Sequence, residues 1–162
     1  MTTDGYVAIV EMDQCDTLKS LRPKRYLGYR LLDNGEVEHL VEDNRGNSVK
    51  VKAGCGNCVF CRLLKATYLV GPPVMKEDRM KFVVLYNWAA RRIIESNRGR
   101  VREFRVVRKE AVILTERQRE LLERGVKEGL SVSRLARSEG VSKPAVSKAL
   151  RKALSKALLV LA

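Results

Sequence analysis

The first two thirds of the chain alternate apolar and polar residues over short stretches, a pattern that predicts β-strands. Six stretches are rich in β-branched and aromatic residues, namely Tyr6–Met12, Tyr26–Leu32, Val37–Val41, Ser48–Lys52, Lys81–Tyr86 and Val101–Val107. Before the last of these, Trp88–Ser96 has the period of a helix with Ala89, Ile93 and Ile94 facing inward. The pattern predicts a small, mostly antiparallel sheet with covering helices, for which a ferredoxin-like arrangement is one candidate.

Turn residues separate the predicted strands. Asp33-Asn34-Gly35 lies between two of them, and Asn-Gly favours the positive φ angles of a type I′ hairpin. Gly71-Pro72-Pro73 breaks the chain again before the Lys81–Tyr86 stretch.

The last third changes to helical spacing with three cap signals. Thr115 with Gln118 predicts a capping box at the start of a helix that reaches about residue 129. Ser131 predicts a short second helix to residue 138, and Ser142 predicts a third. Gly140 falls where the turn between these two helices requires a positive φ angle.

The apolar residues of this segment share one inner side. They are Val132, Leu135, Ala136, Val141, Val146, Ala149 and Leu150. Helices packed in this way predict a helix-turn-helix. The fold class is therefore α+β, with an N-terminal sheet domain over residues 1–110 and an all-α helix-turn-helix domain over residues 111–162.

Polar and basic side chains remain on the outer side of the third helix. Those predicted to contact DNA bases in a major groove are Ser142, Lys143, Ser147, Lys148 and Arg151. Those predicted to contact phosphates are Ser131, Ser133, Arg134, Arg137 and Lys152.

Net charge points to the same partner. The chain carries +13, and residues 98–162 hold 17 Lys and Arg against 7 Asp and Glu, which places ten of the thirteen charges there. We therefore expect a transcription regulator that binds specific double-stranded DNA sequences. An RNA- or ribosome-associated basic protein with a structural cysteine-ligated metal is the alternative.

Four cysteines form a second cluster of interest: Cys15, Cys55, Cys58 and Cys61. The last three are spaced three apart beside Gly54 and Gly56, which suits a metal-binding knuckle, and Cys15 would complete four thiolates around zinc. Disulfides and an iron–sulfur cluster are alternatives, as are buried thiols without a ligand. A redox effector acting on these thiols, or a small-molecule effector, is also compatible with the sequence.

Signals for catalysis are absent from the sequence. His39 is the only histidine, and its alternating strand context predicts an exposed strand residue. With no nucleophile–histidine set and no phosphate-binding glycine loop, we expect a protein that is not an enzyme.

The opening MTTDGYVAIV lacks a basic signal region and no stretch of about 20 apolar residues occurs, so we expect a cytoplasmic protein without membrane contact.

The segment from Leu114 to about Leu158 resembles the helix-turn-helix of archaeal regulators of the bacterio-opsin activator type, and is similar to LuxR-type and sigma factor region four modules. The residues that carry the resemblance are Leu114, Thr115, Arg117, Gln118, Leu121, Leu122, Leu135, Ala136, Gly140, Val141, Ser142 and Val146. The resemblance implies DNA binding by this segment and a preceding N-terminal domain of about this size. The KEGLS segment between the first two helices is shorter than in many members of that type.

Apolar residues continue beyond the resemblance. Leu150, Leu154, Ala157, Leu158 and Leu161 form a stripe at helical spacing. The stripe predicts either packing on the N-terminal domain or a homodimer, which would read two half-sites.

Overall fold

The computed structural model describes residues 5–53 and 58–161, and the chain divides after Val107 into two compact units. We call residues 1–107 the first unit and residues 108–162 the second unit. The fold is α+β, with the described strands grouped into two antiparallel sheets.

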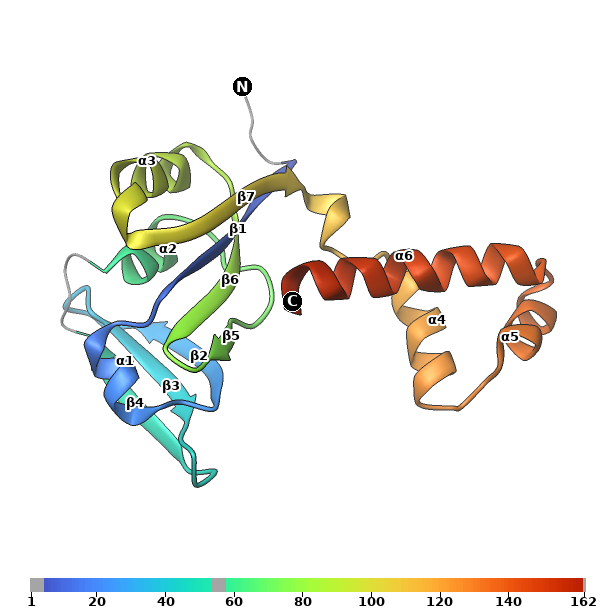
Figure 1. Ribbon diagram of the computed structural model, residues 1–162, viewed down its shortest axis with the longest axis horizontal. Coiled ribbons are helices and arrows are strands. Elements are labelled where there is room, and N and C mark those ends of the chain that lie inside the picture. The colour runs from blue at the N-terminus through green and yellow to red at the C-terminus, as the bar shows by residue number, and fades with distance from the viewer. Residues whose placement is uncertain (1–4, 54–57, 162) are drawn as a thin grey trace. The chain divides into compact units, whose positions relative to one another are not determined.

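A four-stranded sheet organises the first unit. It consists of β1 (Tyr6–Asp13), β5 (Val74–Lys76), β6 (Arg79–Leu85) and β7 (Val101–Arg108), in the order β5-β6-β1-β7. Strands β1 and β6 are antiparallel, with Val7 opposite Leu85 and Asp13 opposite Arg79. Helices α2 (Val59–Ala66) and α3 (Trp88–Ser96) cover one face (Figure 1). Without the segment between β1 and α2, the element order is β-α-β-β-α-β, which is also that of the predicted ferredoxin-like arrangement.

The segment between β1 and α2 forms a sheet of its own. Helix α1 (Asp16–Leu21) precedes β2 (Arg25–Leu31), β3 (Val37–Glu42) and β4 (Ser48–Ala53), and these strands pair antiparallel in that order. The prediction of a single sheet is therefore wrong. Short connections let these three strands pair with one another, so they need no place in the larger sheet.

The turn between β2 and β3 also differs from its prediction. Gly35 has φ 80°, whereas Asn34 does not have a positive φ angle, so the type I′ prediction is wrong. The Gly35 N–H donates to the Leu32 carbonyl, and the Leu32 N–H donates to the Glu36 carbonyl, both at 2.9 Å. A three-residue loop with glycine last accounts for this geometry, since only the last position needs a left-handed backbone.

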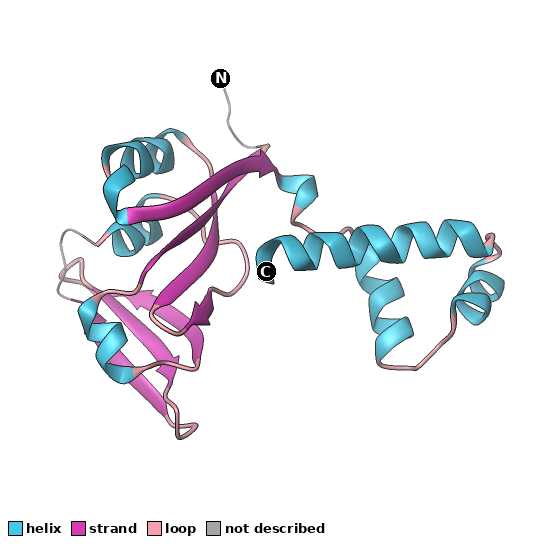
Figure 2. Ribbon diagram, in the orientation of Figure 1, coloured by secondary structure: helices cyan, strands magenta, loops and turns pink. Residues whose placement is uncertain are grey.

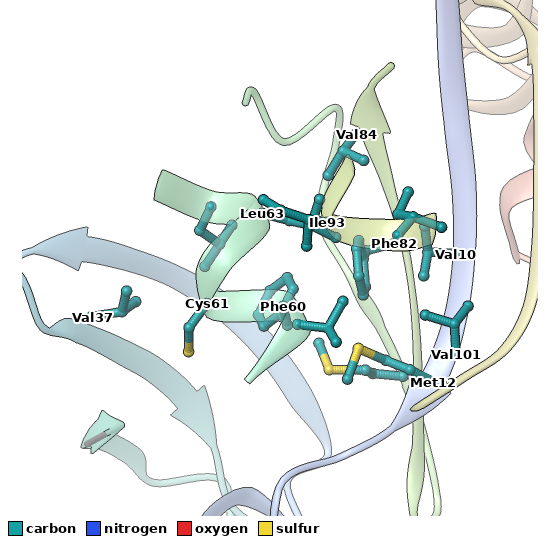
Figure 3. Close-up of a cluster of buried hydrophobic side chains, with 14 of the residues drawn as sticks. Val10, Met12, Val37, Phe60, Cys61, Leu63, Phe82, Val84, Ile93 and Val101 are labelled. Atoms are coloured by element: carbon teal, nitrogen blue, oxygen red, sulfur yellow. The ribbon is translucent and has the colours of Figure 1, made fainter. Parts of the chain in front are cut away.

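One core joins the two sheets, and Phe60 of α2 lies at its centre (Figure 3). The Phe60 ring is 4.7 Å from the Phe82 ring of β6 and 5.5 Å from the Tyr26 ring of β2, measured between centroids. On α3 the buried residues are Ala90, Ile93 and Ile94, so Ala90 takes the inner position predicted for Ala89.

After Arg108, the last residue of β7, the described part of the second unit contains helices and the turns between them (Figure 2). After a short 3₁₀ turn at Lys109–Ala111 come α4 (Glu116–Val126), α5 (Val132–Glu139) and α6 (Lys143–Leu161). All three α-helices contact one another.

Candidate nucleic-acid interface

The core of the second unit holds its three helices together. Leu121 of α4, Leu135 and Ala136 of α5, and Val146 of α6 are all buried. Val132, Val141, Ala149 and Leu150 pack around them and are partly buried. The inward positions predicted in this segment are thus confirmed, and the opposite side of α6 is left to solvent.

Side-chain caps begin each of the three α-helices of the second unit. The Gln118 N–H donates to Thr115 Oγ1 at 3.1 Å and the Thr115 N–H donates to Gln118 Oε1 at 3.0 Å, which is the predicted capping box. Ser131 Oγ accepts from the Arg134 N–H and Ser142 Oγ accepts from the Ala145 N–H, each at 3.3 Å. Helix α4 ends at Val126, earlier than predicted, and its C-cap residue Lys127 remains helical in backbone.

The turn between α5 and α6 depends on Gly140. Its φ of 65° ends α5 in the left-handed conformation, and the Val141 N–H then donates to the Ala136 carbonyl at 3.1 Å. This bond closes the end of α5 and leads the chain directly into the Ser142 cap. The direction of α6 relative to α5 is therefore set by backbone geometry.

Most residues predicted to contact bases are exposed on α6 or at its cap. Ser142, Lys143, Lys148 and Arg151 are exposed, and Ser147 is partly buried. Helix α6 carries five Lys or Arg residues and no carboxylate between Lys143 and Leu161. The structure thus presents a basic helix face with hydroxyl groups at its start.

The residues predicted to contact phosphates lie on α5 and α6. Ser131, Arg134, Arg137 and Lys152 are exposed, and Ser133 is partly buried. Within residues 5–53 and 58–161, no ion pair occupies the six cations Arg134, Arg137, Lys143, Lys148, Arg151 and Lys152. We call these six residues the cation set.

Nearby carboxylates are directed to other cations. Glu139 lies 3.7 Å from Arg117 and 3.6 Å from Arg124, and Glu123 lies 3.9 Å from Lys127. The first turns of α5 and α6 contain no acidic residue, whereas α4 begins with Glu116. The positive ends of α5 and α6 are therefore left for an external anion.

A hollow of about 530 Å³ brings part of this face together with a residue that the sequence analysis did not single out. Lys148, Arg151 and Lys152 line it with Lys156. The Lys156 ammonium donates to Gln118 Oε1 at 2.7 Å and to the Ile113 carbonyl at 3.0 Å, so it anchors α6 to the start of α4. The spacing of 148, 152 and 156 signals one helix face, but only the fold shows the contact with α4.

The apolar stripe of α6 divides into two parts. Leu150 packs against the core of the second unit, whereas Leu154 and Leu158 are 52% and 61% exposed. The homodimer stays a prediction.

The cysteines lie apart from this face, in the first unit. Cys15 and Cys58 are the N-cap residues of α1 and α2, and both line one cavity of about 590 Å³. Cys61 is buried on α2, and Cys55 lies outside the described residues. Over residues 5–53 and 58–161 there is neither a disulfide nor a cluster of three side chains that could ligate a metal.

His39 is 1% exposed, so the prediction of an exposed strand residue is wrong. Its Nδ1 lies 2.5 Å from the Tyr26 hydroxyl, and its Nε2 lies 3.4 Å from the Cys61 sulfur. Burial lowers the pKa of His39 to about 4, and burial, with Cys61 nearby, raises the pKa of the Tyr26 phenol. Helix α2 covers the His39 ring through Phe60 and Cys61. The alternation of residues along a strand cannot show that a helix packs on the face where His39 lies.

Comparison with family models, curated proteins and solved structures found no match for this chain. No helix in the described part of the chain is long and apolar enough to cross a bilayer.

Proposed function

We propose that the chain is a transcription regulator that binds specific double-stranded DNA sequences through α5 and α6. In this proposal the two helices form a helix-turn-helix, and α6 enters the major groove. The observation that carries it is the cation set, which is exposed on α5 and α6 and forms no ion pair with any residue that the structure describes. Lys and Arg side chains that are not neutralised by protein carboxylates can bind the phosphates of a nucleic acid.

The basic residues of α6 and the serine caps of α5 and α6 suit different kinds of contact with DNA. Lys148 and Arg151 lie one turn apart on α6, and both can donate to guanine O6 and N7 in the groove. Ser131 and Ser142 begin helices without acidic first turns, which favours phosphate oxygens near their N–H groups. The resemblance of residues 114–158 to bacterio-opsin activator-type regulators supports the same assignment.

Binding of selected duplexes by the full chain tests the proposal. Duplexes enriched from a random-sequence pool supply the probe, and fluorescence anisotropy measures affinity. We expect Lys148→Ala and Arg151→Ala each to weaken binding about tenfold or more, because a base contact contributes about 1–3 kcal/mol. Lys127→Ala is the matched control and should leave affinity nearly unchanged, since Lys127 is the C-cap residue of α4 and pairs with Glu123.

Two results would contradict the proposal. One is failure of the random pool to yield any enriched sequence. The other is equal binding of structured RNA and duplex DNA that neither substitution on α6 weakens, which would favour the RNA-associated alternative.

A further inference from the structure

The two cysteines at the start of α2 have different surroundings. Cys58 is the N-cap residue, partly buried, and lines the 590 Å³ cavity. Cys61, three residues later in the first turn, is 3% exposed. Because a side chain at the N-cap lies beside the residue three positions on, the Cys58-Val59-Phe60-Cys61 spacing puts an accessible thiol next to an inaccessible one.

Three aromatic side chains, Phe60, Tyr26 and His39, pack near Cys61 and contact one another. The His39 ring stacks on Phe60 with an interplanar angle of 16°, and Tyr26 meets Phe60 edge-on at 78°. The Tyr26 hydroxyl contacts His39 Nδ1, and His39 Nε2 faces the Cys61 sulfur at 3.4 Å. Side chains from β2, β3 and α2 thus form a row of polar contacts, from the Tyr26 hydroxyl through the His39 ring to the Cys61 sulfur.

Proton positions follow from burial. The Tyr26 hydroxyl is in contact with His39 Nδ1, and donation to that nitrogen satisfies its buried O–H. A buried, neutral His39 then carries its proton on Nε2, where it donates to the Cys61 sulfur. An N–H donor of this kind stabilises negative charge on sulfur.

We propose that Cys58 and Cys61 form a reversible dithiol site that reacts with low-molecular-weight disulfides, with Tyr26 and His39 as positioning residues for Cys61. This inference is independent of DNA binding. It assigns a covalent chemistry to the first unit and a separate role to each thiol.

The exchange takes two steps. The Cys58 thiol loses its proton to water, and its sulfur attacks one sulfur of the small disulfide, forming a mixed disulfide and releasing one small thiolate that takes up a proton. The Cys61 sulfur, which also gives up its proton, then attacks the Cys58 sulfur and releases the second small thiol. Two protein thiols are oxidised by two electrons to one disulfide, and the small disulfide is reduced to two thiols.

The test uses the full chain, reduced, freed of reductant and mixed with glutathione disulfide, followed by alkylation, intact mass and peptide mapping. We expect the wild-type chain to lose two thiols, keep no glutathione and yield a Cys58–Cys61 linked peptide. Cys61→Ser should accumulate glutathione at Cys58, because the second step is blocked. Cys58→Ser should react at Cys61 slower by about tenfold or more, because that sulfur is buried.

Two further variants separate the site from its surroundings. Cys15→Ser changes a thiol of the same cavity and should still yield the Cys58–Cys61 disulfide. Tyr26→Phe keeps the ring but removes the hydroxyl that holds the His39 proton on Nε2. The His39–Cys61 contact of the reduced form should then weaken, which shifts the equilibrium with glutathione about fivefold toward the disulfide. A purely structural role for Tyr26 would leave that equilibrium unchanged.

Several outcomes would overturn the proposal: glutathione retained by the wild-type chain, adducts at Cys15 or Cys55 alone, or one thiolate-bound zinc per purified chain that alkylation releases. If Cys61→Ser does not fold, the order of labelling in the wild-type chain decides. Trapping with a small alkylating agent must then modify Cys58 before Cys61.

Discussion

A single buried imidazole makes the first unit sensitive to acid. Burial holds the pKa of His39 at about 4, below the ordinary value of 6.5 that the unfolded chain would have. Between these values the unfolded state binds more protons than the folded state. The stability that the folded first unit gains by keeping His39 neutral is therefore fully present above pH 6.5 and is lost as pH falls toward 4.

We predict that the free energy of unfolding of the first unit falls by about 2 kcal/mol between pH 7 and pH 5. Urea titrations followed by the fluorescence of Trp88, the only tryptophan, would measure it. His39→Gln is the control and should lose most of this pH dependence, because no other histidine is present. An unchanged slope in that variant would mean that other groups cause it.

The alternating strand pattern gave a wrong prediction for His39, whereas the capping residues of the second unit were predicted correctly. Thr115, Ser131 and Ser142 act within four residues of their own position, so their roles follow from local sequence. The environment of His39 comes from Cys61 and Phe60, more than twenty residues away. A residue whose partners are distant in sequence carries no local signal of them.

At the scale of elements, Gly140 controls how α5 leads into α6. An added Cβ would meet no atom within 4 Å, but the φ of 65° is unfavourable for any residue with a Cβ. We predict that Gly140→Ala destabilises the second unit by about 1 kcal/mol through backbone strain. Thermal or urea unfolding monitored by far-UV circular dichroism would measure the change.

Gly125 provides the matched control for this change. It lies in α4, and an added Cβ would make an ordinary contact of 3.8 Å with Leu135. Gly125→Ala should stabilise the unit by up to about 1 kcal/mol, because alanine favours a helix. Equal effects of the two substitutions would show that the backbone angle at Gly140 is not what matters.

Short elements escaped the sequence analysis, whereas longer periodic ones did not. The limits of α3 agree with prediction, but α1, α2 and β5 were missed. Helix α2 has only eight residues, so its apolar positions repeat over little more than two turns and give a short periodic signal. Because α2 was not predicted, the contact between Cys61 on that helix and His39 was not predicted either.

For the whole molecule, charge makes a quantitative prediction about DNA. If Arg134, Arg137 and Lys152 contact three phosphates, the logarithm of affinity should fall with the logarithm of salt concentration with a slope of about −3 per chain. Anisotropy titrations on the enriched duplex over a range of NaCl concentrations would measure it. Lys152→Ala should reduce the slope by about 1, while Lys127→Ala should not, and a slope near zero would rule out this polyanion contact.

The sequence by itself determined the α+β class, the caps and turn of the second unit, and the residues of its basic face. These depend on local periodicity, local hydrogen bonds and the absence of carboxylates from one helix, all of which can be read from neighbouring positions. Only the tertiary structure decided that the described strands form two sheets, that Lys156 anchors α6 to α4, and that Tyr26, His39 and Cys61 meet. These contacts join segments far apart in the chain, and packing around a shared core is what brings them together.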